Sequence, residues 1–321
     1  MAYQVSGTEK IKDDNTVTFK TVTVTNYYTL KTSLGSATSF GYASAGYVNP
    51  VVAQNTIDKF SFSVDQNATD VGDLTQTRWN LSGQSSSTHG YSTGGQTSPS
   101  VNSNIIDKFS FASDGNATDV GDTTVETPGS GGQSSSENGY AAGRFPNLNE
   151  IQKFPFAADA NATDVGDLSL ARSVNAGQSS LVNGYASGGS TPAAQNTIDK
   201  FPFAADANAT DVGDLTQARS ANAGQSSDVS GYSSGGYVAP YTNIIDKFSF
   251  ASDGNATDVG DLTTTRFSTS GQSSETNGYT SGGYLPANQN EIDKFPFSAD
   301  ANATDVGDLS QARSAPTGQQ G

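Results

Sequence analysis

The sequence predicts an all-β fold: a six-bladed β-propeller over residues 39–321, with about 47 residues in each blade. Three observations lead to this prediction. A repeat occurs six times, each copy holds four short strand-like runs, and the two ends of the repeat region complement each other. Residues 1–38 fall outside the repeat and form a separate, β-rich N-terminal extension.

The repeat is recognised by three short motifs that return at a nearly fixed period. The phenylalanine of "IDKF" or "IQKF" recurs at spacings of 49, 45, 47, 47 and 47 residues, and a "GY" and a "GQ" pair recur with it. The phenylalanines are Phe60, Phe109, Phe154, Phe201, Phe248 and Phe295. A fixed period of this length is typical of propellers and other repeat architectures.

Each repeat contains four β-type runs separated by turn residues. In residues 172–219, "RSVNAGQSS" is followed by "GYASGG", then by "TIDKFPFAAD", and finally by "ATDVGDLTQAR". Glycine and proline are too frequent for helices, and no run has a sustained 3.6-residue period. Four strands in about 47 residues is the size of one propeller blade.

The ends of the repeat region indicate how the ring closes. "SFGYASAG", near residue 40, corresponds to the second strand of a repeat, whereas "ARSAPTGQQG" at the other end corresponds to a first strand. We therefore expect residues 313–321 to pair beside the strand around Tyr42. This strand exchange between the termini would complete the sixth blade and remove an open sheet edge.

The order R…G-Q…G-Y-x-x-G-G…I-D-K-F…V-G-D-L resembles the kelch repeat over residues 39–321. The double glycine stands at 94–95, 188–189, 235–236 and 282–283, and the arginine at Arg78, Arg172, Arg219, Arg266 and Arg313. Valine replaces the usual tryptophan, Thr127 stands where the second repeat should have arginine, and Arg144 replaces a glycine. The resemblance implies the fold but not the function, because kelch propellers serve many functions. This Asp-rich version also resembles repeats in virion proteins of marine tailed phages.

Composition excludes several classes of partner. The net charge is −16 and there is no cysteine, so we expect no binding to nucleic acid or to anionic membrane, and no disulfides. No run of 18 apolar residues occurs, so we expect no membrane insertion, and residues 1–34 lack the apolar run of a secretory signal. Hydrophobic residues make up only 33%, but 12 of the 16 phenylalanines occupy fixed repeat positions, which argues against disorder.

An acidic "NATD" segment also occurs in all six repeats. It could be a glycan acceptor, a calcium loop or a turn. In the second copy the oxygen ligands would be Asp114, Asn116, Asp119 and Asp122, but the EF-hand spacing and its terminal glutamate are absent. Asn and Asp favour turns, so the turn is the preferred interpretation and we expect no metal. We further expect Lys59 and its five equivalents to pair with aspartates between blades.

Catalytic signatures are missing. The single histidine, His89, stands where other repeats have asparagine, and no phosphate-binding loop, zinc-protease motif or nucleophile elbow is found. Carboxylate pairs are copied six times, so none is a distinctive acid or base. The sequence predicts a protein that is not an enzyme and needs no cofactor.

The repeats differ in length only between their second and third strands, where the six loops span 11, 11, 7, 9, 9 and 9 residues. These loops should share a face with the connections between blades. The aromatic residues expected on that face are Tyr47, Trp79, Phe145, Tyr237, Tyr241, Phe267 and Tyr284. Aromatic residues on loops of a rigid scaffold suit recognition of sugars or proteins. The competing interpretation is that each aromatic residue caps its own blade.

Residues 1–38 include "NTVTFKTVTVTNYYTL", whose alternation predicts a strand. "VSGTEKIKDDNTVTF" resembles the short N-terminal attachment segments of phage fibre and virion surface proteins. The residues expected to anchor the chain to other virion proteins are Val17, Phe19, Val22, Val24, Tyr27 and Tyr28. The competing interpretation is a simple strand packed on the propeller.

Together these features indicate a non-enzymatic structural virion protein of a tailed phage. Made in the host cytoplasm and exposed on the particle surface, it would serve decoration or adhesion to a host-surface glycan or protein. The alternative is a cellular kelch-type scaffold that binds a protein partner.

Overall fold

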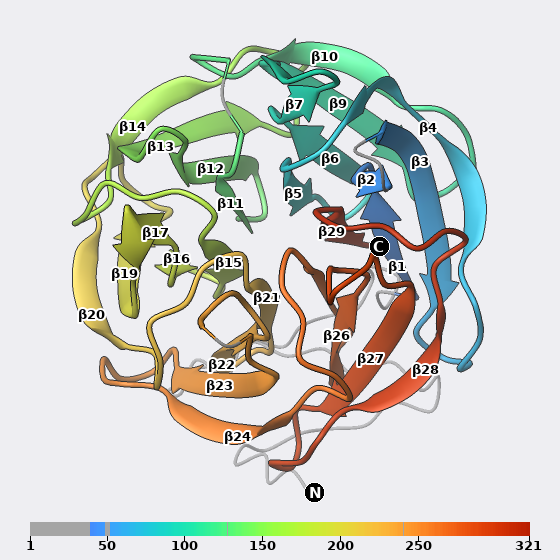
Figure 1. The fold of residues 1–321 in the computed structure, drawn as a ribbon. Coiled ribbons are helices and arrows are strands. Elements are labelled where there is room, and N and C mark those ends of the chain that lie inside the picture. The colour runs from blue at the N-terminus through green and yellow to red at the C-terminus, as the bar shows by residue number, and fades with distance from the viewer. Residues whose placement is uncertain (1–38, 49–51, 127, 240) are drawn as a thin grey trace, which may run out of the picture. The chain divides into compact units, whose positions relative to one another are not determined.

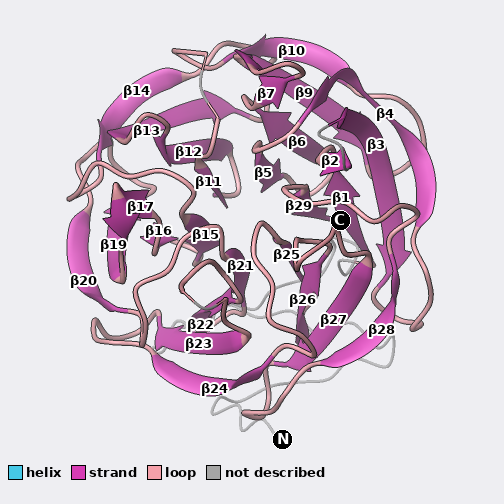
Figure 2. Cartoon of the chain, viewed as in Figure 1, coloured by secondary structure: helices cyan, strands magenta, loops and turns pink. Residues whose placement is uncertain are grey.

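Six antiparallel sheets, each with four main strands, surround a central axis in the computed structural model, which describes residues 39–48, 52–126, 128–239 and 241–321 (Figure 1). All regular secondary structure in these residues is β-strand (Figure 2). The predicted six-bladed β-propeller is confirmed. In each blade the first strand lies nearest the axis and the fourth lies on the outside (Figure 1).

The blades are numbered I to VI in chain order, and their strands are given from the axis outward. Blade I has β29 (Thr317–Gln320), β1 (Phe40–Ser44), β3 (Val52–Ser61) and β4 (Thr69–Arg78). Blade II has β5 (Ser82–Ser85), β6 (His89–Thr93), β9 (Ile105–Ser110) and β10 (Thr118–Asp122). Blade III has β11 (Gly131–Ser134), β12 (Asn138–Arg144), β13 (Leu148–Pro155) and β14 (Thr163–Asp167). Blade IV has β15 (Ala176–Ser179), β16 (Asn183–Ser187), β19 (Thr197–Pro202) and β20 (Thr210–Asp214). Blade V has β21 (Ala223–Ser226), β22 (Ser230–Ser234), β23 (Ile244–Ser249) and β24 (Thr257–Asp261). Blade VI has β25 (Ser270–Ser273), β26 (Asn277–Ser281), β27 (Glu291–Pro296) and β28 (Thr304–Asp308).

Blade I is assembled from both ends of the repeat region, as expected. Strand β29 pairs antiparallel with β1, with Gln319 opposite Tyr42. The N–H groups of Ser39 and Phe40 also donate to the carbonyl of Gly321, at 2.7 and 2.9 Å. The strand exchange therefore completes the sixth blade and leaves no unpaired inner edge at the junction.

The glycine of each "GQ" pair lies where neighbouring inner strands almost touch. A Cβ atom on Gly177 would overlap the carbonyl oxygen of Gly132, and one on Gly224 would overlap that of Gly177. The same relation links all six inner strands in a closed circle, through Gly83, Gly132, Gly177, Gly224, Gly271 and Gly318. Backbone alone fits there, so only glycine is compatible with this approach of the blades.

A second circle consists of backbone hydrogen bonds between the connections that lead from one blade to the next. In each connection one residue has a left-handed backbone, with φ between 50 and 80°. Its N–H donates to the carbonyl of the equivalent residue in the preceding connection, at 2.6–3.4 Å. The six residues are Asn80, Gly129, Val174, Ala221, Ser268 and Ala315. Each conformation is individually unfavourable for a non-glycine residue, and the closed hydrogen-bond circle offsets that cost.

The "GQ" glutamines and the "GY" tyrosines connect neighbouring blades. The Nε2 of Gln178 donates to the carbonyl of Tyr232 in the next blade, at 2.9 Å. The ring of Tyr185 stacks on Phe250 of the next blade, with centroids 4.8 Å apart. Both contacts recur at all six blade junctions. Burial raises the pKa of the Tyr42 and Tyr279 hydroxyls to about 12, so these tyrosines stay neutral at physiological pH.

The "NATD" segment is a turn that also joins two blades. Asn208 accepts a hydrogen bond through Oδ1 from the N–H of Asp167 in the preceding blade, at 3.1 Å. The N–H of Ala209 donates to the carbonyl of that same Asp167, at 2.7 Å. Lys153, also in the preceding blade, pairs with Asp206 at 2.5 Å. All six copies repeat this pattern, so the predicted lysine–aspartate pairs between blades are confirmed.

The repeated arginine makes a buried ion pair with the aspartate of "IDKF" in the next blade. Arg219 lies 3.0 Å from Asp246, and neither side chain is exposed. The aspartate is held further by the N–H and hydroxyl of Thr216, at 3.0 and 2.7 Å. The other pairs are Arg78–Asp107, Arg172–Asp199, Arg266–Asp293 and Arg313–Asp58, the last of which joins blades VI and I.

Blade III lacks both members of this ion pair. The sequence has Thr127, outside the described residues, in place of the arginine and Gln152 in place of the aspartate. Gln152 instead accepts a hydrogen bond from the N–H of Thr124, at 2.9 Å. Blade III still has a buried arginine, but at a different repeat position. Arg144 replaces the second glycine of the double-glycine motif and pairs with Glu150. The replacements of the arginine by Thr127 and of the aspartate by Gln152 are thus linked. Because both partners change, neither leaves a buried charge without its counter-charge.

This linkage makes a prediction about Arg219. We expect Arg219→Thr alone to lower the free energy of unfolding by about 3–5 kcal/mol, because it leaves Asp246 buried without its counter-charge. The double variant Arg219→Thr/Asp246→Gln, which copies the residues of blade III, should lose less than the single variant. Denaturant midpoints would measure both. The exposed pair is the control, since Lys200→Thr should cost less than about 1 kcal/mol. A double variant as unstable as the sum of its two single variants would contradict this account.

Candidate functional site on the variable face

The loops between second and third strands lie on the same face as the connections between blades. The backbone of Trp79, in a connection, pairs with Gln96 in a loop, and Phe267 pairs in the same way with Tyr284. We call this side the variable face. The hairpins between first and second strands meet the "NATD" turns on the other side, where the N–H of Phe111 donates to Thr88 at 3.0 Å. We call that side the NATD face.

Length differences among the loops are accommodated as short hairpins above the blades. In blade I, β2 (Tyr47–Val48) pairs with the start of β3. Blade II has β7 (Gln96–Thr97) with β8 (Val101–Asn102), and blade IV has β17 (Ser190–Thr191) with β18 (Ala193–Ala194). In these three blades the loops therefore contain paired backbone.

Three consecutive blades carry a tyrosine at the same repeat position, directly after the double-glycine position. These are Tyr237 in blade V, Tyr284 in blade VI and Tyr47 in blade I. Phe267 packs between the first two, with ring centroids 5.4 Å from Tyr237 and 5.6 Å from Tyr284. Tyr241 adds a fourth ring, 4.9 Å from Phe267.

A pair of aromatic residues lies next to this cluster, in the following blade of the propeller and the connection after it. Trp79 packs edge-on against Tyr47, with centroids 5.2 Å apart. Asn288 joins the pair to the cluster, because its backbone pairs with Tyr284 and its Nδ2 donates to the carbonyl of Tyr47 at 3.0 Å. We call the cluster of four rings and the pair of rings together the aromatic arc: Tyr241, Tyr237, Phe267 and Tyr284, then Tyr47 and Trp79.

Of the seven aromatic residues that the sequence placed on this face, the structure brings four together in one cluster and two in another. Phe145 is separate: it lies in blade III, is 55% exposed, and has no ring contact with the arc. The capping interpretation is partly right, since Trp79 packs on the loop of the blade that it follows. Packing does not bury the arc, however, because Tyr237 remains 47% exposed and the others are half-buried. The proposed anchoring residues in 1–38 lie outside the described residues.

The variable face is almost free of unpaired charge, a property that the sequence analysis missed. The loops and connections contain six arginines, all of them buried, and three glutamates. Glu150 pairs with Arg144, and Glu291 lies 3.7 Å from Arg266, so only Glu126 remains unpaired among the described residues of this face. The acidic residues of each "TDVGD" lie instead on the outermost strands. The signal was available, because the loop sequences contain hardly any Asp or Lys.

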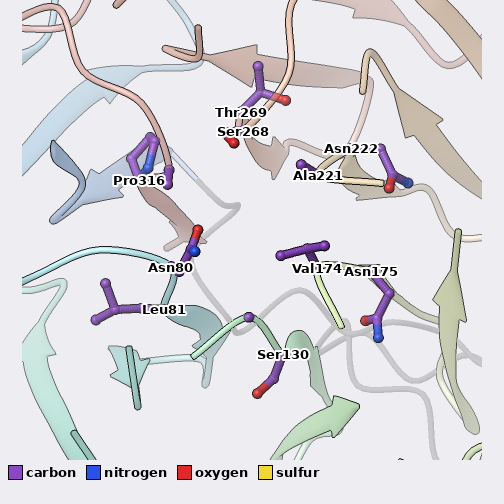
Figure 3. A pocket seen from close by; sticks show the side chains of 12 residues that line it. Asn80, Leu81, Ser130, Val174, Asn175, Ala221, Asn222, Ser268, Thr269 and Pro316 are labelled. Atoms are coloured by element: carbon purple, nitrogen blue, oxygen red, sulfur yellow. The ribbon is translucent and has the colours of Figure 1, made fainter. Parts of the chain in front are cut away.

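A small pocket of about 70 Å³ opens at the axis on the variable face (Figure 3). Two residues from each of the six connections line it, including the circle of left-handed residues. Its amides serve the blades: Asn175 donates to the carbonyl of Ala142 at 3.1 Å, and Asn222 to the hydroxyl of Ser233 at 2.6 Å. This volume suits a few water molecules and not a sugar ring.

Three of the four candidate ligands of the proposed calcium loop bind other groups through their side-chain oxygens. Asp114 pairs with Lys59 at 2.8 Å, Asn116 accepts from the N–H of Asp73 at 3.1 Å, and Asp119 accepts from Gly121 at 3.2 Å. Within the described parts of the chain, no group of three or more His, Cys, Asp or Glu residues is arranged to hold a metal. His89 begins β6, where its Nδ1 lies 2.8 Å from the hydroxyl of Thr88 and burial lowers its pKa.

Comparisons with known proteins give no relative: no family model matches the chain, and no curated protein matches it. Among the described residues there is also no helix long and apolar enough to cross a membrane. The fold therefore rests on the structure, and any function has to be argued from the variable face.

The partners of the "NATD" oxygens predict indifference to calcium. Treatment with a chelator should leave the melting temperature within about one or two degrees, because a bound ion would stabilise the fold by mass action. Thermal unfolding with excess calcium and with chelator makes the comparison. A drop of many degrees on chelation would mean that the acidic turns are ion sites.

Proposed function

We propose that this chain is a non-enzymatic structural protein of a tailed phage virion. It displays the propeller on the particle surface, for decoration or for adhesion to a host surface through the variable face. The observation that carries this proposal is the aromatic arc, two clusters of half-exposed rings linked through Asn288, on a side of an acidic molecule that has little unpaired charge. Aromatic residues fixed in this way lose little conformational freedom on binding.

Sequence resemblance supports the virion assignment. The repeat is similar to the kelch repeat, and its Asp-rich, near-identical form is similar to repeats in virion proteins of marine tailed phages. The same kelch-like order favours one alternative, a cellular scaffold that binds a protein partner.

Residues 1–38 supply the proposed anchor. They contain four lysines and three acidic residues, so they are nearly neutral, whereas the propeller carries essentially all of the negative charge. Alternating Thr and Val in this segment suit addition of a strand to a sheet of another virion protein. Val17, Phe19, Val22, Val24, Tyr27 and Tyr28 are the side chains proposed to make that contact.

An assembly and adhesion experiment tests both parts of the proposal. Particles would be assembled with the full chain, with a chain lacking residues 1–38, and with Trp79→Ala. The truncated chain should fold but fail to join particles, because the anchor is gone. Trp79→Ala should join particles normally and adhere several-fold more weakly to host cells, because it removes one end of the aromatic arc. Particle composition and cell-bound particle counts are the two measurements.

Val182→Ala is the matched control, since Val182 is 63% exposed on the NATD face. It should affect neither assembly nor adhesion. Incorporation of the truncated chain into particles would overturn the anchor. Equal adhesion of Trp79→Ala and the unmodified chain would overturn the variable face as the adhesive surface. If the chain is absent from particles and instead binds a cellular protein, the alternative function of a cellular scaffold would be favoured.

A further inference from the structure

We infer that the ligand of the variable face is an uncharged polysaccharide, bound along the aromatic arc across blades V, VI and I. This inference rests on the proposed function, since it takes the variable face as the binding surface. It adds the chemical class of the ligand and the part of the face that binds it.

The rings of the arc offer the surface that a sugar needs. A pyranose has apolar C–H faces and a rim of hydroxyls, so it binds to an aromatic ring with polar groups beside it. Tyr237, Tyr241, Tyr284 and Tyr47 each combine a ring with a hydroxyl. Successive rings lie 4.9–5.6 Å apart within the two clusters, and Asn288 connects these clusters.

Charge selects against anionic glycans. Carboxylate, sulfate or phosphate groups require cationic partners or lose their hydration without compensation. The six arginines of this face are buried, and five of them each form an ion pair with a buried aspartate in the neighbouring blade. All six lysines of the propeller form ion pairs with aspartates of the "NATD" turns. The acidic outer strands add long-range repulsion of any polyanion.

The arrangement of the arc indicates an extended chain of sugars. It extends over three consecutive blades, V, VI and I, and ends at Trp79 in the connection to blade II. The tyrosine position is held by Gln96 in blade II and by Ser190 in blade IV. On the other side of the face only Phe145 of blade III occupies this position with a ring, and it makes none of the ring contacts that hold the arc together. Contacts spread along several blades fit several sugar units better than one monosaccharide in a deep pocket, and the pocket at the axis is too small for one.

A protein partner fits the same face less well. The centres of protein interfaces are usually formed by well-exposed aromatic residues with arginine. Here the arginines are buried, and most rings of the arc are half-covered by one another. These features favour a sugar as the ligand. The experiment below can also reveal a protein ligand.

The experiment measures binding of the full chain to soluble polysaccharides by calorimetry. The neutral probes are dextran, mannan and laminarin, and the anionic probes are alginate and heparin. At least one neutral probe should bind, with an affinity that changes little between about 50 and 500 mM NaCl. Tyr237→Ala and Phe267→Ala should each weaken that binding about tenfold or more. Phe145→Ala is the matched control, as an exposed aromatic residue on the same face but outside the arc, and should bind normally.

Binding of anionic probes alone, or of none of the probes, would overturn the inference. Equal weakening by Phe145→Ala and Tyr237→Ala would overturn the assignment to the arc. The proposed function can survive this failure. If particles carrying Trp79→Ala adhere weakly, and if protease treatment of the host cells also abolishes adhesion of unmodified particles, the variable face is still the adhesive surface. Its ligand would then be a protein.

Discussion

The structure depends on the contact of six backbone segments at the axis. Each inner strand places a glycine against the carbonyl of the preceding inner strand, and no side chain fits between them. A closed circle of backbone hydrogen bonds lies beside it, formed by the left-handed residues of the connections. Because every junction has to meet the same geometry, a change that suits one junction disturbs its neighbours. This constraint explains why the "GQ", "GY" and "NATD" segments vary so little among the copies.

The repeats vary mainly at positions that take no part in the conserved contacts between neighbouring blades. The loops above the blades differ in length and in side chains, and three consecutive blades carry tyrosines there. Blade III shows the limit: where it abandons the buried arginine–aspartate pair, it changes both positions and brings in Arg144 with Glu150. Charge is divided in a similar way, with aspartates on the outer strands and the NATD face and almost none on the variable face. One side of a strongly acidic protein therefore carries little unpaired charge.

Much of the fold could be predicted from the sequence, because its signals are local and are copied six times. The period gave six blades, the complementary ends gave the pairing of β29 with β1, and the repeat placed Lys153 near an aspartate of the next blade. The circle of glycines and the bond from Asn208 to Asp167 could not be foreseen, because they join residues that meet only when the ring closes. Closure of the propeller also separates Phe145 from the other aromatic residues. The position of a blade around the axis, and not the type of loop, decides which aromatic side chains make contact. The anchoring role of residues 1–38 stays a prediction, since they lie outside the described residues.

The most direct measurement of the central constraint is the stability of Gly177→Ala. The added methyl group is among the smallest changes that a side chain can make, and in an ordinary strand alanine in place of glycine is neutral or favourable. At the axis the methyl overlaps the carbonyl of Gly132, so the two inner strands must separate. The account predicts a loss of about 1–3 kcal/mol in the free energy of unfolding, whereas Leu181→Ala, at a 70% exposed position in the same blade, should change it by less than about 0.5 kcal/mol. Equal stabilities of Gly177→Ala and the unmodified chain would show that the blades do not meet at their glycines, and would contradict the account.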